Sequence, residues 1–200
     1  QSQLRGGDWS AGDVRYSDLN GDGEIGPGES TLDNPGDRTV IGNSSPRYRF
    51  GIRGGINWKK INLSFLFQGV GKRDYMPGGN YFWGLTNEWN VPQQHSLDYW
   101  TPDNPDAYWP RPRFNQGGNF QTSNRYLQDA SYIRLKNLTI GYTLPEEISE
   151  KLYMRNLRVY ISGENIWEYS KILDSYDPEV LNPSTYPLQR SLAIGLDLTF

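Results

Sequence analysis

The chain has 200 residues, a formal net charge of −3 and no cysteine. The nearly balanced charge gives no field that would attract nucleic acid, and the absence of cysteine excludes disulfides, thiolate catalysis and cysteine-ligated zinc. Aromatic residues are abundant, with 14 Tyr, 7 Trp and 7 Phe beside 22 Gly and 13 Pro. This composition favours β-strands and structured loops over helices. The sequence contains no run of about 18 apolar residues, the length that a membrane-spanning helix needs.

A polar run from Asp18 to Glu29 fits the calcium-loop pattern D-x-[DN]-x-[DN]-G-x5-E in full. Alternate positions supply oxygens, and a glycine permits the sharp turn. The predicted Ca2+ ligands are Asp18, Asn20, Asp22, Glu24 through its carbonyl, and Glu29. Because Pro27 and Gly28 disfavour a following helix, we expect an isolated loop with a structural calcium ion. The alternative is a polar Asx turn without metal.

Two alternating segments, Tyr48–Trp58 and Ile61–Gly69, predict a pair of antiparallel strands. A strand turns successive side chains to opposite faces, so each segment has one apolar and one polar face, with Leu66 as an exception on the polar face of the second segment. The link Lys59-Lys60 is short enough for a tight hairpin. The polar face of the first segment carries Arg47, Arg49 and Arg53, which an apolar core could not hold without partners. The apolar faces carry Tyr48, Phe50, Ile52, Ile56 and Trp58, then Ile61, Leu63, Phe65 and Phe67.

The stretch Val70–Ala130 has neither a helical nor a strand period, and it is rich in proline, glycine and aromatic residues. We expect a long loop, in which exposed rings can stack on sugars or anchor a partner protein. The candidate ligand or partner contacts are Trp83, Trp89, Trp100, Trp109, Arg111 and Arg113. The alternative is that most of the rings form the loop's own core and that the arginines are solvated.

Two further strands are expected in Ser131–Leu144 and Asn156–Ile166. The first changes phase near Lys136-Asn137, which predicts a β-bulge. The second places Leu157, Val159 and Ile161 outward. Between the two strands, Pro145–Leu152 suits a short helical turn with proline at its first position and acids early.

The last nine residues alternate without exception. Leu192, Ile194, Leu196, Leu198 and Phe200 are apolar, whereas Ala193, Gly195, Asp197 and Thr199 are small or polar. A terminal strand of this kind is typical of the closing strand of a transmembrane β-barrel, with lipid outside and a watery lumen inside. Trp58 and Trp167, at opposite ends of their strands, fit interfacial aromatic girdles.

The pattern predicts an all-β protein, an antiparallel transmembrane β-barrel segment of about five strands with long extracellular loops. The connections alternate between long and short, as in outer-membrane barrels, and this places Phe200 in the periplasm. Because about eight strands make the smallest barrel, the remainder must come from elsewhere. Gln1–Gly7 lack the pattern of a signal peptide, so we expect a start within a longer polypeptide. A soluble antiparallel sandwich is the alternative, but it would have short loops throughout.

The expected organisation follows from these assignments. Residues 1–46 form an extracellular loop with the EF-hand-like calcium motif, 47–70 a barrel hairpin, 71–130 the long aromatic-rich extracellular loop, 131–166 two barrel strands with a periplasmic turn, 167–187 an extracellular loop, and 188–200 the C-terminal closing strand.

No catalytic constellation is legible in the sequence. His95 is the only histidine, so it cannot form a zinc cluster, and no Ser/His/Asp set surrounds it. Asp174, Asp177 and Glu179 could imitate paired glycosidase carboxylates, but an acidic loop is usually solvated. We assign no catalytic residue and expect that the protein is not an enzyme.

Several segments together resemble the late section of SusC/RagA-type TonB-dependent transporters of Bacteroidetes. The match runs in order from about Gly12 to Phe200. The segments are Asp13–Gly23, Asp37–Gly42, Pro46–Tyr48, Phe67–Gly71, Ser131–Tyr142, Gly163–Asn165, Tyr176–Glu179 and the final Phe200.

The resemblance implies a barrel of about 22 strands plugged by an amino-terminal domain. The chain would be its carboxy-terminal portion in the cell outer membrane, surrounded by lipid. It also implies a SusD-like surface lipoprotein as partner, energy from the TonB complex through the missing amino-terminal part, and import of glycan oligosaccharides or peptides. The alternative function is a soluble, secreted, calcium-stabilised carbohydrate-binding β-module.

Overall fold

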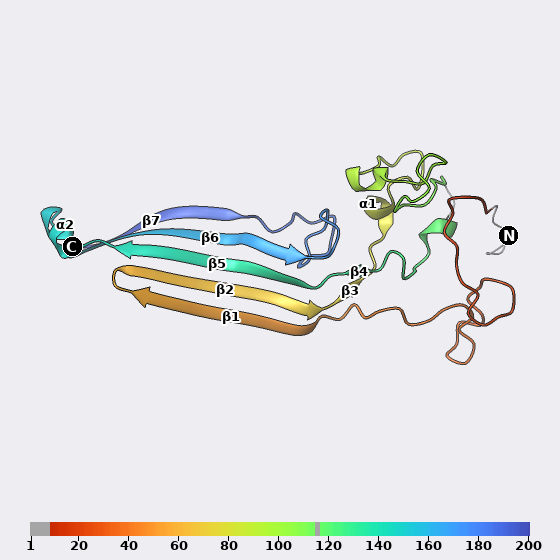
Figure 1. Ribbon diagram of the computed structural model, residues 1–200, viewed down its shortest axis with the longest axis horizontal. Helices are drawn as coiled ribbons and strands as arrows, with labels where there is room; N and C mark the ends of the chain where they lie inside the picture. Colours follow the sequence, from red (N-terminus) through yellow and green to blue (C-terminus); the bar gives the residue numbers. More distant parts are fainter. Residues whose placement is uncertain (1–8, 115–116) are drawn as a thin grey trace. The chain divides into compact units, whose positions relative to one another are not determined.

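The computed structural model describes residues 9–114 and 117–200 (Figure 1). The expectation about a start at Gln1–Gly7 lies outside the described residues. The chain divides into two compact units. The first combines Gln1–Gly42 with Met76–Leu127, and the second combines Asn43–Tyr75 with Gln128–Phe200. Segments that are distant in the sequence therefore form each unit.

The second unit is an antiparallel sheet in the order β1-β2-β5-β6-β7, in which each strand pairs with the next long strand along the chain (Figure 1). Its strands are β1 (Arg47–Trp58), β2 (Ile61–Lys72), β5 (Tyr132–Thr143), β6 (Asn156–Ser170) and β7 (Ser191–Thr199). A small ladder of β3 (Asp74–Tyr75) and β4 (Gln128–Asp129) follows the β2–β5 pair. The expected antiparallel all-β fold is confirmed, and the described strands form an open sheet.

The predicted hairpin and bulge are both present. Trp58 pairs with Ile61, so Lys59 and Lys60 alone connect β1 to β2, and Lys59 has a φ of 53°. The β5–β6 register shifts between Leu135 and Asn137, which confirms the phase change in the sequence. A matching irregularity in β6 at Asn165, with a φ of 51°, lets this strand run to Ser170 rather than ending at Ile166.

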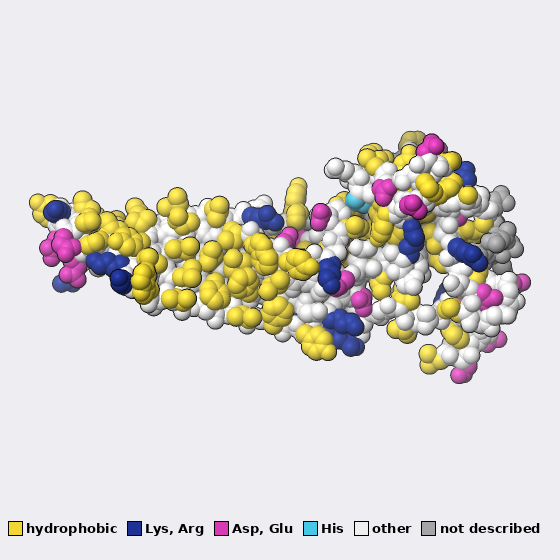
Figure 2. All heavy atoms as spheres, in the orientation of Figure 1, with side chains coloured by type: hydrophobic (Ala, Val, Ile, Leu, Met, Phe, Trp, Pro, Cys, Tyr) yellow, Lys and Arg dark blue, Asp and Glu magenta, His cyan; other side chains and the backbone are white. Residues whose placement is uncertain are grey.

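One face of the sheet is apolar in every strand. The register places Ile56, Leu63, Ile140, Ile161 and Ile194 in one row across all five strands. A second row contains Trp58, Ile61, Tyr142, Val159 and Leu196. Most of these side chains are exposed, and Figure 2 shows hydrophobic side chains gathered over the strands. Leu157 shares this face but is buried, at the end of β6 against which α2 packs.

The opposite face is polar, with small uncharged residues in the middle of the sheet. One row across it contains Gly55, Ser64, Thr139, Ser162 and Ala193. On this face Arg134 lies near the start of β5, Arg158 near the start of β6 and Asp197 near the end of β7, whereas Glu164 lies in the middle of β6. Each strand therefore separates its side chains into an apolar and a polar face, as the period-two pattern predicts.

The connection between β5 and β6 contains the short helix α2 (Glu146–Lys151). Pro145 is its N-cap rather than its first residue, a one-position correction to the sequence expectation. Glu146 and Glu147 lie in the first turn and Lys151 in the last, as the helix dipole favours.

The first unit contains little regular structure and is organised around aromatic rings. Its short helices are α1 (Gly79–Trp83), η1 (Gln94–Leu97) and η2 (Gly118–Phe120). Phe82 and Tyr126 are fully buried, and the Trp109 and Tyr126 rings stack with an interplanar angle of 7°. The long aromatic stretch thus forms a folded body with its own core. In the described residues, no helix combines the length and apolar character needed to cross a membrane.

A glycine on the polar face allows close packing of a tyrosine. A Cβ atom at Gly195 would lie 2.2 Å from Cζ of Tyr160, its cross-strand neighbour. We predict that Gly195→Val lowers the free energy of unfolding of the complete protein by about 1–3 kcal/mol through overpacking. Ala193→Val, two residues away on the same face, should have a smaller effect in thermal unfolding. Equal losses in the two variants would contradict this packing argument.

Candidate functional site

The most densely charged part of the polar face surrounds Arg134 of β5. Its side chain is almost completely buried, with 1% of the residue surface exposed. The cross-strand neighbour Glu168 of β6 accepts hydrogen bonds from Nε, at 2.9 Å, and from Nη2. The register of β5 and β6 therefore places Arg134 beside Glu168, its first carboxylate partner.

The loop between β6 and β7 supplies two further carboxylates to Arg134. Nη2 of Arg134 lies 3.0 Å from Oδ2 of Asp177, and Nη1 donates to Oε2 of Glu179 at 2.9 Å. Lys136, at the β5 bulge, lies 3.1 Å from the same Glu179 oxygen. Arg190 approaches Glu168 at 3.9 Å. Three acidic and three basic side chains therefore balance within this cluster, which we call the Arg134 cluster.

Asp177 also organises the backbone of its own loop. Its carboxylate accepts hydrogen bonds from the N–H groups of Glu179, at 2.9 Å, and of Leu188, at 3.0 Å. Burial alone would raise the pKa of Asp177, but these N–H groups and Arg134 hold that pKa below its ordinary value. The carboxylate is therefore ionised at neutral pH, as its contact with the guanidinium requires.

The same loop has a small apolar core. Ile172, Tyr176 and Leu181 are buried, and the ring of Tyr176 packs edge-on against Tyr75 at a centroid distance of 5.8 Å. The hydroxyl of Tyr75 donates to the carbonyl of Leu181 at 2.8 Å. Residues 172–181 thus form a compact body, whereas residues 182–190 are exposed.

A second ion pair on the polar face has no loop partner in the described residues. Nη1 of Arg158 lies 2.5 Å from Oδ2 of Asp197, and its Nε donates to Asn62 at 3.1 Å. The guanidinium also lies over the Tyr160 ring, 5.0 Å from its centroid. This pair connects β6 to β7 and provides a natural comparison for the Arg134 cluster.

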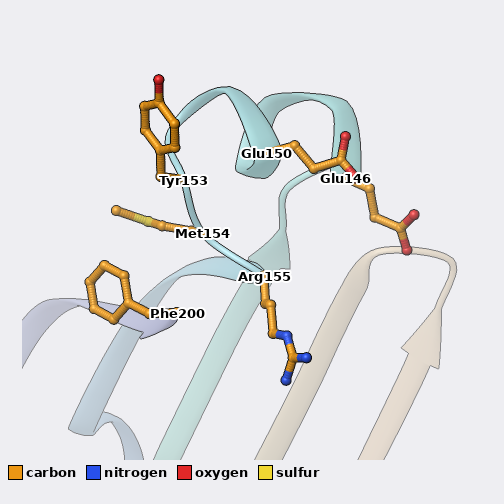
Figure 3. A pocket seen from close by; sticks show the side chains of 6 residues that line it. All are labelled: Glu146, Glu150, Tyr153, Met154, Arg155 and Phe200. Atoms are coloured by element: carbon orange, nitrogen blue, oxygen red, sulfur yellow. The ribbon is translucent and has the colours of Figure 1, made fainter.

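An open pocket of about 370 Å³ lies beside α2 and the last residue (Figure 3). Tyr153, Met154 and Phe200 lie on one side of it, and Arg155 projects from the other. Glu146 and Glu150 complete the lining. It contains none of the residues that the sequence analysis selected as metal or ligand contacts.

The structure separates the aromatic candidates into core and surface residues. Trp83 and Trp109 are buried in the aromatic core, which favours the alternative that they form the core of the first unit. Their role as ligand contacts stays a prediction. Trp100 is half-buried and packs on Gly12, where any Cβ would meet the indole. Trp89 is 84% exposed, so it remains a candidate for contact with a ligand or partner protein.

The two arginine candidates hold the segment that precedes the calcium motif. Arg113 forms an ion pair with Asp13 at 2.5 Å, and Nη1 of Arg111 donates to Ser10 at 2.9 Å. The buried Asn119 donates to Asp13 and accepts from the N–H of Val14. Arg113 therefore has an internal partner, which favours a structural role, and its contact with a ligand or partner protein stays a prediction.

The predicted calcium loop is closed by Asx-type hydrogen bonds. Asp18 accepts from the N–H groups of Gly21 and Gly23, at 2.6 and 2.9 Å, and Asp22 accepts from that of Glu24 at 2.8 Å. Asp37 accepts from the N–H groups of Gly26 and Leu19, which lower its pKa. No cluster of three or more His, Asp or Glu arranged for a metal exists among the described residues. Calcium binding by this loop stays a prediction.

Comparisons with known proteins agree with the sheet pattern. The TonB-dependent receptor P3 of Formosa agariphila is 29% identical over 213 residues, which cover 97% of this chain and 20% of the receptor. The TonB-dependent receptor P26 of the same organism is 27% identical, over 94% of this chain and 20% of the receptor. This chain is similar to TonB-dependent receptors over nearly all of its length. It spans about a fifth of the length of the curated relatives it matches.

Solved structures of the RagAB peptide importer share the fold of this chain. A chain of the RagAB peptide importer in its open-open state has a TM-score of 0.58 and 26% identity, over 85% of this chain and 19% of that chain. In the closed-closed state the TM-score is 0.63 at 24% identity, with the same coverage of both chains. No family model matches the chain. The resemblance seen in the sequence is confirmed.

Reasoning from residue types did not identify the Arg134 cluster as a site. The sequence analysis treated Asp177 and Glu179 as a solvated acidic loop, whereas the structure pairs both with a buried arginine. Arg134 and Lys136 lie in the segment Ser131–Tyr142, and Asp177 and Glu179 lie in the segment Tyr176–Glu179. Both segments carry the resemblance to TonB-dependent transporters. A charged residue at a strand position was the available signal, because such a residue needs a partner.

The Asp13–Arg113 pair predicts a pH dependence in the first unit. Burial would raise the pKa of Asp13, but hydrogen bonds from Arg113, Ser10 and Asn119 hold it below its ordinary value. Its contribution to stability is therefore present above about pH 3.9 and lost as the pH falls through the lower folded pKa. Asp13→Asn should cost about 1–3 kcal/mol at neutral pH, measured by tryptophan fluorescence during denaturation. The exposed Asp106→Asn serves as control, and equal losses would contradict the account.

Asp22→Ala tests the calcium prediction. If the loop binds calcium, the metal content of the purified complete protein should fall by one ion per chain, because a carboxylate ligand is lost. Asp33→Ala, outside the motif, is the matched control. An unchanged metal content in Asp22→Ala would remove the loop from the set of metal sites.

Proposed function

We propose that this chain is part of the wall of a TonB-dependent outer-membrane transporter. The observation that carries the proposal is the apolar face that runs unbroken across all five strands and stays exposed. In the described residues no second layer covers it. A lipid bilayer would cover this face without further protein. The backbone hydrogen-bonding groups of β2, β5 and β6 are already paired on both sides, and only the edge strands β1 and β7 have an unpaired side.

The polar face supports the same function. Ionic groups such as Arg134 and Arg158 are tolerated on one face of a membrane strand only where that face meets water or other protein. An aqueous lumen provides this environment. Arg49 and Arg53 on β1 are exposed on this face and would meet a solute passing through it.

The proposed topology places the first unit and residues 171–190 outside the cell, and α2 and Phe200 on the periplasmic side. The remainder of the barrel, a plug domain and the contact with TonB belong to other parts of the protein. The similar solved structures are those of the RagAB peptide importer. By analogy we propose a SusD-like surface lipoprotein as partner and import of peptides or glycan oligosaccharides. The relatives are named as receptors or transporters, which supports a role without catalysis.

The soluble carbohydrate-binding module is the less favoured alternative. It would need its apolar sheet face covered by a second sheet, and the described residues supply none. Four of the aromatic rings that could form a sugar platform are buried in the core of the first unit, namely Phe82, Trp83, Trp109 and Tyr126, whereas Trp89 and Phe114 are exposed.

A charge on the lipid-facing side tests the proposal. Leu196→Arg in the complete protein should block assembly into the outer membrane, because such a charge near the bilayer midplane costs about 2–4 kcal/mol. Ala193→Arg places the same residue on the polar face of the same strand and should assemble. A heat-modifiability gel of outer-membrane fractions reports assembly. Normal assembly of both variants would count against the lipid-facing assignment.

A further inference from the structure

The β6–β7 loop reaches onto the polar face of the sheet rather than away from it. Its contact residues are Asp177 and Glu179, and they meet Arg134 and Lys136 of β5. The cross-strand pairing of Gln68 with Arg134, and of Arg134 with Glu168, places this arginine on the polar face. The middle of a loop of 20 residues, 171–190, is therefore held over the inside of the proposed wall.

Arg134 is the residue on which this arrangement depends most. It contacts three carboxylates, two of them from the loop, and its side chain is 2% exposed. Lys136 contacts one loop carboxylate and keeps 22% of its side chain exposed. Removing one partner of a buried ion group leaves the others uncompensated, so losing Arg134 leaves three neighbouring carboxylates that repel each other.

The loop body is rigid enough to act as one unit. Asp177 fixes the loop backbone through the N–H groups of Glu179 and Leu188, and Tyr75 binds the carbonyl of Leu181. The buried ring of Tyr176 packs on Tyr75, and Pro178, between the two acidic residues, is also fully buried. Because the carboxylate that binds Arg134 is the one that shapes the loop, attachment and loop conformation are coupled.

We propose that residues 171–190 are a fixed part of the inner wall, anchored by Arg134, and not a freely moving lid. Arg134 is a positioning residue in this proposal, because it determines where the loop surface stands in the opening and touches no solute itself. The inference uses the proposed function only to name the polar face as the lumen wall. The anchoring follows from the ion cluster alone.

Hydrogen exchange of the complete protein tests the anchor. In Arg134→Gln we expect the amides of residues 177–188 to exchange at least about tenfold faster than in the parent, with little change in β1 and β2. Arg134→Lys keeps one charge but loses the three-carboxylate contact, so it should be intermediate. Arg158→Gln breaks the ion pair with Asp197 on the same face and should leave the loop unchanged.

Faster exchange spread equally over loop and sheet would overturn the positioning role, since it would report general destabilisation. Unchanged loop exchange in Arg134→Gln would overturn the anchor itself. If Arg134→Gln does not assemble, Glu179→Gln replaces it, because this carboxylate is on the loop and the sheet retains its Arg134–Glu168 pair. Its loop amides must then exchange faster than those of Arg158→Gln, or the proposal fails.

A distance measurement separates this proposal from the proposed function. Spin labels at Ser184 in the loop and Lys60 in the β1–β2 turn should give one narrow distance distribution in the parent protein and a broad one in Arg134→Gln. A broad distribution in the parent would contradict a fixed loop. Neither hydrogen exchange nor the distance distribution depends on lipid contact. If Leu196→Arg assembled normally and so contradicted the lipid-facing assignment, these two measurements would still test the anchor at Arg134 independently.

Discussion

Strand periodicity is the constraint on which the rest of this structure depends. Antiparallel pairing satisfies the backbone within the sheet, and each strand must then place alternate side chains on opposite sides. In this chain β1, β2, β5, β6 and β7 follow that rule in the same sense, so these five strands build one apolar and one polar face. A bulge at Lys136 and an irregularity at Asn165 keep the faces in phase where β5 and β6 change register. The lipid-facing assignment, the inner ion pairs and the loop positions follow from this division.

The polar face has a different character from a soluble surface. Its arginines on β5 and β6 have carboxylate partners at 2.5–3.0 Å, and one of them is buried. The Arg134 cluster uses its charge to bring a loop from outside the sheet onto the wall. The first unit is instead held together by stacked and edge-on aromatic rings around Phe82 and Tyr126.

The sheet could be predicted from local rules of side-chain alternation and turn length. Contacts between residues far apart in the sequence could not be predicted from these rules. The β1–β2 hairpin, the bulge and the terminal strand follow from alternation and turn length, which neighbouring residues determine. The partners of Arg134 could not be found in this way, because Asp177 and Glu179 are 43 and 45 positions away and their loop has no period. Trp83 and Trp109 likewise give no local signal that distinguishes a core ring from a binding ring. The calcium loop has a strong pattern, but its oxygens also satisfy an Asx turn, so the pattern alone leaves metal binding as a prediction.

The central claim is that hydrocarbon covers the apolar face and water the polar one. Single cysteines can be introduced at Ile194 and Ala193, adjacent residues on opposite faces of β7, and the 200 residues of this chain contribute no other cysteine. Spin labels on the complete protein in lipid bilayers then report collisions with oxygen, which concentrates in hydrocarbon, and with a water-soluble nickel complex. The account predicts oxygen-dominated collisions at position 194 and nickel-dominated collisions at position 193. Water contact at both positions, or burial of position 194 against protein with neither reagent reaching it, would contradict it.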